Sequence, residues 1–342
     1  MKISVLIPCF NEEKSIKRCV ESCLNQSRKP DEIVVVDDGS TDRSYDILRS
    51  FGRKIRLVRN RRNLGNKSFA QEAGLRVLTG DVFITADADS VLGSDFVKRV
   101  SLAFEADPEL VAFAGYVKSL KNNWITACRE IDYLIGQIIH KTAQQTINSL
   151  FVIPGCGGAF KAGIFREFIG FDHDTVTEDL DFTYKVNLKR FKIHYDRKAV
   201  VYTQDPPNLK SYLRQMRRWY SGGWQCLLKH SRSVRRVGTA LELSLIYVEG
   251  LVFSVLLFLV PLINVYFLAF LVLPHFLVGL AFSFYGAAVD RNYKLPFYTP
   301  LFVFLIFVNS AVFVYSFARE ILLHKRELFW LRADRGGLLC SR

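Results

Sequence analysis

The sequence predicts an α/β domain built on a mostly parallel, twisted sheet with flanking helices, followed by transmembrane helices at its C-terminal end. Two observations support this prediction. Apolar strand patterns alternate with helical patterns through residues 1–235, as in a parallel sheet with crossover helices. The composition then changes, and residues 241–288 contain only two acidic or basic side chains, Glu242 and Glu249.

The elements of the first part follow one another in a regular order. The stretches "ISVLIP", "DEIVVVDD", "IRLVRN" and "DVFITADAD" have the apolar, β-branched composition of buried strands. Between them, "NEEKSIKRCVESCLNQS", "SYDILRSF" and "KSFAQEAGLRVLT" have the composition and apolar spacing of helices. We therefore expect one domain over residues 1–235, with its ligand site at the carboxyl ends of the strands. No secretory signal is visible at the start, so this domain is expected in the cytosol.

The second part, residues 236–320, contains three apolar segments, at about 242–261, 264–287 and 296–318. Each is long enough as a helix to cross, or nearly cross, a hydrocarbon core of about 30 Å. A buried helical hairpin is the alternative, but the segments are apolar on all sides, as contact with lipid allows.

The membrane topology is left open by the flanking charges. The basic stretch before the first apolar segment and the basic tail, residues 321–342, should both face the cytosol. Three full crossings would place them on opposite sides. Either one segment lies in the interface or is re-entrant, or the tail breaks the rule.

The charge balance is strongly basic, with a formal net charge of +13 from 46 Lys and Arg against 33 Asp and Glu. Such a balance suits nucleic acid, phosphate-bearing ligands or an anionic membrane face. A non-catalytic protein that binds nucleic acid or anionic lipid through residues 210–236 would explain the basic run but not the acidic clusters, so no nucleic-acid partner is expected. The seven cysteines form no CxxC pair and are expected to be reduced.

Two acidic pairs, Asp37 with Asp38 and Asp87 with Asp89, end predicted strands at the same edge of the sheet. Like charges this close repel one another, so a cation is expected beside them. Asp87 and Asp89 point the same way along an extended segment and could both reach one Mg²⁺ or Mn²⁺, which would retain positions for substrate phosphates. Capping of the following helix is the alternative.

A third acidic cluster, Glu178, Asp179 and Asp181, falls at the start of a predicted helix, with Thr177 as its N-cap. Ordinary helix capping would account for it. The cluster follows the glycine-rich stretch "PGCGGAFKAGIF", which lets another backbone or a sugar approach closely. A carboxylate beside that stretch could accept a proton from an attacking hydroxyl.

The stretch "YLRQMRRWYSGGWQ" has apolar residues at helical spacing, which indicates a core or interface face. Its arginines suit diphosphate oxygens, and its tryptophan suits the face of a sugar ring. A basic helix against a lipid surface is the alternative.

The order "IPCFNEE", "VVVDDGS", "TADADS", "TEDLD" and "QMRRW" resembles the family 2 glycosyltransferases, which have the nucleotide-sugar-binding GT-A fold. The last motif matches the QxxRW pattern of that family through Gln215, Arg218 and Trp219. The resemblance covers residues 3–224 and continues more loosely to "FWLRADRGG". Within the family, "TVTEDLDFTYKV" and "RRWYSGGW" look most like poly-N-acetylglucosamine synthases, with hyaluronan, chitin-oligomer and cellulose synthases as more distant relatives.

This resemblance implies a membrane-bound enzyme that inverts the anomeric carbon and transfers a sugar from a UDP-sugar to a growing β-linked glycan, with Mg²⁺ or Mn²⁺ as cofactor. Asp179 would be the general base, and either Asp37 or Asp38 would hold the uracil. The resemblance implies donor contacts at Pro8, Glu12, Asp37, Asp38, Lys67, Asp87, Gln215, Arg218 and Trp219, a metal on Asp87 and Asp89, and acceptor contacts at Gly157, Glu178 and Trp219.

The resemblance also frames the alternative function, which is transfer of a single sugar to a membrane lipid, as in ceramide and polyprenyl-phosphate glycosyltransferases. Poly-N-acetylglucosamine synthases usually carry transmembrane helices before the catalytic domain, and none precedes "ISVLIP" here. A polymer channel would then need a second copy of the chain or an accessory export subunit. The expected partners are a UDP-sugar, a glycan or lipid acceptor and the bilayer, for an integral protein of the plasma membrane with a cytosolic catalytic domain.

Overall fold

The computed structural model describes residues 1–120, 123–234 and 238–326, and it confirms the α/β class. Within these residues, eight strands form one sheet in the order β3-β2-β1-β4-β7-β6-β8-β5. The strands are β1 Ile3–Cys9, β2 Glu32–Asp37, β3 Arg56–Arg59, β4 Val82–Thr85, β5 Val91–Leu92, β6 Leu110–Ser119, β7 Gly158–Lys161 and β8 Lys192–Thr203.

The sheet is mixed rather than wholly parallel. Strands β3, β2, β1 and β4 run parallel, as do β6 and β8, whereas β7 is antiparallel to both of its neighbours and β5 is antiparallel to β8. The exceptions are short strands, too short for a period-two pattern to stand out. In β7, the glycine-rich stretch forms part of the sheet instead of only a turn. The pairing of Cys9 with Asp37 and of Leu6 with Thr85 brings the acidic strand ends to one edge, as expected.

Helices cover both faces of the sheet, and the alternation of side chains along β1 shows why. Val5 and Ile7 pack into a buried cluster with α1 and α4, whereas Leu6 between them packs into another with α3 and α8. The helical segments of this domain are α1 Ile16–Leu24, α2 Ser44–Arg49, η1 Gly52–Lys54, α3 Lys67–Val77, α4 Phe96–Ala106, α7 Ala162–Ile164, η3 Phe165–Ile169 and α8 Glu178–Leu188. Every cysteine in the described part of the chain is buried and free of disulfides, which leaves out Cys340 alone.

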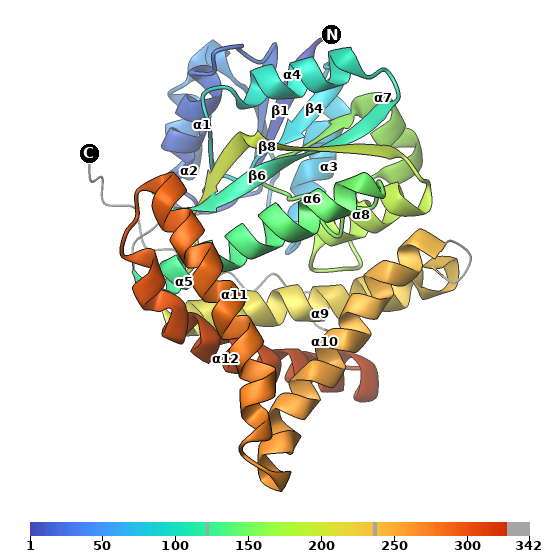
Figure 1. Ribbon diagram of the computed structural model, residues 1–342. Coiled ribbons are helices and arrows are strands. Elements are labelled where there is room, and N and C mark those ends of the chain that lie inside the picture. Colours follow the sequence, from blue (N-terminus) through green and yellow to red (C-terminus); the bar gives the residue numbers. More distant parts are fainter. Residues whose placement is uncertain (121–122, 235–237, 327–342) are drawn as a thin grey trace.

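A second layer of helices lies beneath the sheet domain. Figure 1 shows α9 running under the domain, α10 and α11 projecting away from it as a hairpin, and α12 lying alongside α9. The bounds are α5 Trp124–Leu134, η2 Ile135–His140, α6 Lys141–Thr146, α9 Leu209–Val234, α10 Gly238–Ile263, α11 Phe267–Asp290, η4 Leu295–Tyr298, α12 Thr299–Phe317 and η5 Ala318–Leu322. Tyr212 and Met216 of α9 share a buried cluster with Ile131 of α5 and Leu305 of α12. This cluster packs the three helices against one another.

Three helical segments within the described residues are long and apolar enough to cross a membrane: Leu245–Ile263, Phe267–Val289 and Leu295–Leu322. The turn between the first two segments is closed by hydrogen bonds among its own residues. Asn264 N–H donates to Val260 O at 3.0 Å, and the Asn264 side chain accepts from Tyr266 N–H at 2.9 Å. Such internal pairing is what a hairpin tip needs where water is scarce. The motif "FWLRADRGG" and most of the predicted basic tail lie outside the described residues.

Candidate active site

A cavity of about 850 Å³ opens at the carboxyl ends of β1, β2 and β4, the edge at which the acidic pairs were expected. The predicted site residues that line it are Pro8, Glu12, Asp38, Lys67, Asp87, Asp89, Glu178, Asp179, Gln215, Arg218 and Trp219. Two predicted residues are not among the described residues that line it. Asp37 is fully buried behind the cavity, with its Oδ2 3.2 Å from Arg59 Nε. A Cβ on Gly157 would lie 2.7 Å from Val201, and the neighbouring Gly155 and Cys156 face the cavity instead.

Asp38 follows β2 at a sharp turn. Gly39 has a φ of +72°, which glycine adopts without strain. The Asp38 carboxylate accepts hydrogen bonds from the side-chain amides of Asn60 at 2.6 Å and Asn63 at 2.9 Å. Burial raises the pKa of Asp38, although the amide of Asn60 opposes the rise. The turn therefore presents a positioned hydrogen-bond acceptor at one end of the cavity.

Lys67 places a positive charge beside Asp87, a member of one of the two acidic pairs. It begins α3, where the Asn66 side chain caps the helix by accepting from Ser68 N–H. Its Nζ lies 2.5 Å from Asp87 Oδ1 and 2.6 Å from Glu178 Oε1. Burial alone would lower the pKa of Lys67, but these two carboxylates outweigh it and hold the pKa above its ordinary value. Lys67 thus links the acids after β4 to those at the start of α8.

Asp179 lies in the first turn of α8, as predicted. Thr177 is the N-cap residue, but its side chain makes no capping hydrogen bond, and the carboxylate of Asp179 instead accepts from Leu180 N–H at 2.9 Å. Burial, with help from the charge of Glu178, raises the pKa of Asp179 to about 6, while Lys67 and Arg218 oppose that rise. A carboxylate with this pKa is mostly ionised at neutral pH and still basic enough to accept a proton.

Helix α9 forms part of the cavity wall. Gln215, Arg218 and Trp219 of the QxxRW motif all line the cavity. The buried Oε1 of Gln215 has no hydrogen-bond partner among the described residues, an arrangement that a bound ligand would complete. The guanidinium of Arg129 lies 4.9 Å from the Trp219 ring, which fixes the face that Trp219 presents.

Two glycines let α9 pack without intervening side chains. A Cβ on Gly222 would overlap Thr177, and a Cβ on Gly223 would overlap the hydroxyl end of Tyr247 on α10. The stretch "SGGW" therefore brings the segment before Asp179, α9 and α10 into direct contact.

Sequence reasoning missed a group of cavity residues on the α5–η2–α6 segment, for which no chemistry was expected. Tyr133, Gln137 and Lys141 line the cavity. Burial lowers the pKa of Lys141 to about 8. The π-helical turn η2 changes the direction in which this segment presents its side chains, and a regular helical period gives no sign of it.

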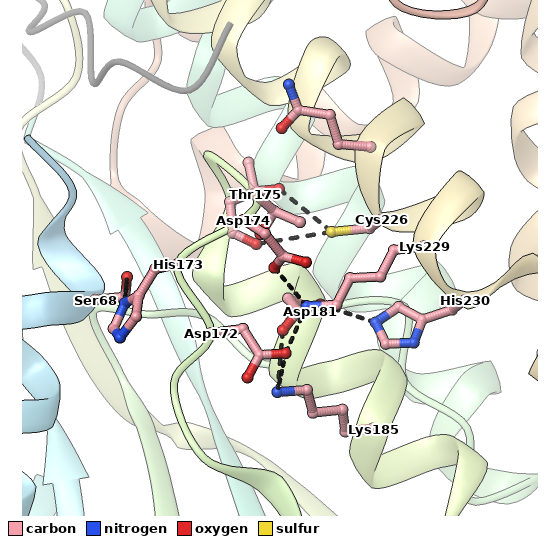
Figure 2. Close-up of polar contacts among 12 residues, drawn as sticks. Ser68, Asp172, His173, Asp174, Thr175, Asp181, Lys185, Cys226, Lys229 and His230 are labelled. Carbon is pink, nitrogen blue, oxygen red and sulfur yellow. Dashed lines mark hydrogen bonds and ion pairs between the residues drawn. The ribbon is translucent and has the colours of Figure 1, made fainter. Parts of the chain in front are cut away.

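Asp181 does not join the cavity, although it belongs to the third acidic cluster. Figure 2 shows it among Asp172, Lys185, Lys229 and His230. Its Oδ1 lies 2.8 Å from His230 Nε2 and 3.0 Å from Lys229 Nζ, and its Oδ2 lies 3.2 Å from Lys185 Nζ. These contacts tie α8 to α9 behind the site, so Asp181 positions the helix that carries Asp179.

A metal site was expected on Asp87 and Asp89. The described residues contain no group of three or more His, Cys, Asp or Glu side chains placed to hold a metal ion. Asp87 and Asp89 nevertheless line the same cavity and offer the carboxylate oxygens that hard cations prefer. Two protein ligands fit an ion whose remaining positions are filled by substrate phosphates and water.

Comparison with known proteins adds to this geometry. Residues 4–168 match the family described as Glycosyl transferase family 2. The poly-beta-1,6-N-acetyl-D-glucosamine synthase of Staphylococcus epidermidis is 27% identical over 232 residues, which cover 66% of this chain and 56% of that protein. The probable glycosyltransferase YdaM of Bacillus subtilis is 29% identical over 237 residues, which cover 67% of this chain and 56% of that protein. The chain therefore matches a little over half the length of these curated relatives.

Solved structures share the fold at lower identity. The mannosyltransferase PcManGT from Pyrobaculum calidifontis, in complex with GDP-Man and Mn2+, is 18% identical with a TM-score of 0.63, covering 95% of this chain and 88% of that one. S. aureus TarS 1-349 is 17% identical with a TM-score of 0.52, covering 94% of this chain and 92% of that one. These similarities confirm the GT-A class that the sequence predicted.

Proposed function

Residues 4–168 form a domain of glycosyl transferase family 2, and from that premise we propose that the protein is a membrane-bound, inverting glycosyltransferase that uses a UDP-sugar. The observation that supports this most directly is the placement of Asp179. Its carboxylate, with a pKa of about 6, lies in the donor cavity beside Lys67 and Arg218. A base and two cations in one cavity suit an acceptor hydroxyl that loses a proton and a diphosphate that leaves with negative charge.

The donor would lie along the carboxyl edge of the sheet. Asp38, rather than the buried Asp37, would accept the N3–H of uracil, near Pro8 and Glu12. Arg218 and Lys67 would contact the diphosphate, and the unpaired Oε1 of Gln215 would accept a hydrogen bond from a hydroxyl of the donor. Mg²⁺ or Mn²⁺ on Asp87 and Asp89 would supply positive charge to the departing diphosphate.

Asp179 would then remove the proton from the acceptor hydroxyl as its oxygen attacks the anomeric carbon. Attack from the side opposite the diphosphate gives one displacement and inverts the anomeric configuration. Trp219, held by Arg129, would support the sugar ring beside Glu178. The buried walls of the cavity would exclude water, which favours transfer of the sugar to the acceptor over its hydrolysis.

The acceptor has two candidates. The names of the curated relatives favour a growing glycan, with N-acetylglucosamine as the sugar. Transfer to a membrane lipid is the second candidate, because the cavity is also lined by residues of α10 and α12, which belong to segments apolar enough to cross a membrane.

The test uses the purified full chain in lipid nanodiscs with Mn²⁺ or Mg²⁺. UDP-N-acetylglucosamine, UDP-glucose, UDP-galactose and UDP-glucuronate are supplied separately, and UDP release is read together with product mass. We expect one donor to give product and Asp179→Asn to abolish it. Release at the same rate from wild type and Asp179→Asn would overturn the proposed base, and equilibrium binding of UDP no tighter than that of ADP would overturn the uridine donor.

A further inference from the structure

The loop that precedes α8 is held from two sides. Residues 170–177 connect η3 to α8. Figure 2 shows the cluster around Asp181 on one side of this loop, and His173 beside Ser68 on the other. The contacts on the second side involve α3, the helix that begins with Lys67. The loop therefore joins α3 to the helix that carries the proposed base.

His173 makes three contacts with the first turns of α3. Its ring stacks on the ring of Phe69, with the centroids 3.8 Å apart and the planes 14° from parallel. Its Nδ1 lies 2.7 Å from Ser68 Oγ, and its Nε2 lies 3.1 Å from Glu72 Oε2. Both ring nitrogens and one ring face thus contact a single helix, which fixes the place and the rotation of the imidazole.

Asn66 binds the backbone of the same loop. Its Nδ2 donates to the carbonyl oxygens of His173 at 3.3 Å and Thr175 at 3.1 Å, and its Oδ1 accepts from Ser68 N–H at 3.1 Å. The Asn66 side chain is buried, so breaking these hydrogen bonds would leave polar groups away from water, which is costly. Asn66 and Ser68 are the two neighbours of Lys67 in the chain. The loop is therefore bound directly before and directly after that lysine.

These contacts set the distance between α3 and the start of α8. Lys67 Nζ lies 2.6 Å from Glu178 Oε1, but a lysine side chain is long and flexible, so the ion pair alone tolerates a shift of one helix against the other. A stacked ring and a short buried amide tolerate much less. Displacement of a catalytic group by about 1 Å can lower a rate by about 10²-fold, so this distance matters for the reaction.

We propose that His173 is a positioning residue for sugar transfer, because it clamps the loop to α3 and thereby holds Asp179 at a fixed place relative to Lys67. His173 is not among the described residues that line the cavity, so it acts through the loop and not on the substrate. This inference rests on the proposed glycosyltransferase function and adds to it a residue that lies outside the sequence motifs.

The first test compares the rate of transfer by wild type and His173→Ala as a function of pH. UDP release is followed in nanodiscs with the UDP-sugar that gives product, and the affinity for UDP is measured by calorimetry. We expect kcat to fall about tenfold or more, with UDP affinity within about twofold of wild type, because the donor contacts stay in place.

The pH profile separates positioning from a general loss of folded protein. Burial and Glu178 raise the pKa of Asp179, whereas Lys67 and Arg218 lower it. Release of the loop from α3 takes Asp179 away from Lys67, so the midpoint of the His173→Ala profile should rise by about 0.5 pH unit or more. Loss of folded protein alone would lower the rate by the same factor at every pH. A lower rate with an unchanged midpoint would overturn the positioning role.

His194→Ala is the matched control. His194 is also half-buried and lies beside an aromatic ring, that of Phe113, near the start of β8. The cavity lies at the other end of that strand, at Thr203. This variant should keep the wild-type midpoint and a rate within about twofold of wild type.

Two further measurements complete the test. His173→Phe retains a ring to stack on Phe69 and loses both hydrogen bonds, so it replaces His173→Ala if that variant does not fold, and its midpoint is judged by the same criterion. Hydrogen exchange of residues 170–180 reports the clamp without any activity and should be faster in the His173 variant than in wild type. Equal exchange would overturn the clamp. Equal rates of Asp179→Asn and wild type would instead overturn the proposed function, whatever the exchange shows.

Discussion

The ammonium of Lys67 and the carboxylate of Glu178, 111 residues apart in the chain, are 2.6 Å from each other inside the candidate active site. The same ammonium lies 2.5 Å from Asp87. One lysine therefore offsets the charge of two acids that come from different parts of the sequence. Without it, Asp87 and Glu178 would lose the cation that lies closest to both of them.

Lys67→Met is expected to lower the free energy of unfolding by about 3–5 kcal/mol, because it leaves two acids without their shared cation. The measurement is denaturant unfolding in detergent micelles. Lys17→Met is the matched control, since Lys17 makes a 4.0 Å ion pair with Glu21 on the exposed surface, and it should cost less than about 1 kcal/mol. Adding Glu178→Gln to Lys67→Met should recover part of the loss, and no recovery would argue against the shared charge balance.

The rate of transfer should follow the ionisation of Asp179. A base acts when deprotonated, and burial raises its pKa to about 6, so the rate should rise with pH up to that value and level off above it. Asp179→Asn should lower the rate by about 10²- to 10⁴-fold. Because Glu178 contributes to the raised pKa, Glu178→Gln should move the midpoint of the profile below 6. A wild-type rate independent of pH between 5 and 7 would exclude Asp179 as the base.

Removal of divalent metal should stop transfer. Chelation by EDTA is expected to abolish product formation, and excess Mn²⁺ or Mg²⁺ should restore it. Asp89→Asn removes one of the two proposed ligands, so the metal concentration for half-maximal rate should rise about tenfold or more, in the range seen when metal-site residues are changed. The metal-dependent part of UDP binding, followed by calorimetry, should weaken in parallel. Full activity in EDTA would show that Lys67 and Arg218 neutralise the departing diphosphate without a metal ion.

Asp181→Asn should act on stability more than on donor binding. The cations around Asp181 hold its pKa well below the ordinary value, against the effect of burial. The charged form therefore stabilises the fold above about pH 4, and this contribution fades as the pH falls below that value. We expect Asp181→Asn to lower the free energy of unfolding by about 3 kcal/mol at pH 7. The free energy of unfolding of this variant should also fall less steeply than that of wild type as the pH is lowered.

The matched control for Asp181→Asn is Asp174→Asn. Asp174 also pairs with Lys229, at 2.6 Å, but its side chain is 60% exposed. Its loss should cost less than about 1 kcal/mol. Equal effects of the two variants would mean that Asp181 has no special part in joining α8 to α9.

The contact of α9 with α10 can be tested through its glycine. Gly223→Ala places a Cβ against Tyr247 and should destabilise the protein by about 1–3 kcal/mol through overpacking. Gly136→Ala adds the same group where nothing lies within 4 Å and should be neutral or slightly stabilising. Tyr247→Phe removes the nearest atom and should partly restore Gly223→Ala. Thermal unfolding of the four variants provides the comparison.

The sequence was informative where local pattern and order determine structure. The alternation of strands and helices predicted the parallel half of the sheet, and the acids after β2 and β4 predicted the edge that bears the cavity. Short elements were harder, because β5 has two residues and β7 has four. Contacts between distant residues were not predictable either. Nothing near Asp181 in sequence indicates that it faces Lys229 instead of the cavity, and the regular period of the α5 segment hides the turn that brings Lys141 into the site.

At its two consecutive glycines, α9 has no side chain between its backbone and the neighbouring segments. Thr177 rests on Gly222, and Tyr247 of α10 rests on Gly223. Packed interiors pass displacement on rather than absorb it, so a shift of α10 reaches the segment that carries Asp179 with little loss. Any agent that displaces α10 at Tyr247 would therefore also displace Thr177, the residue before α8.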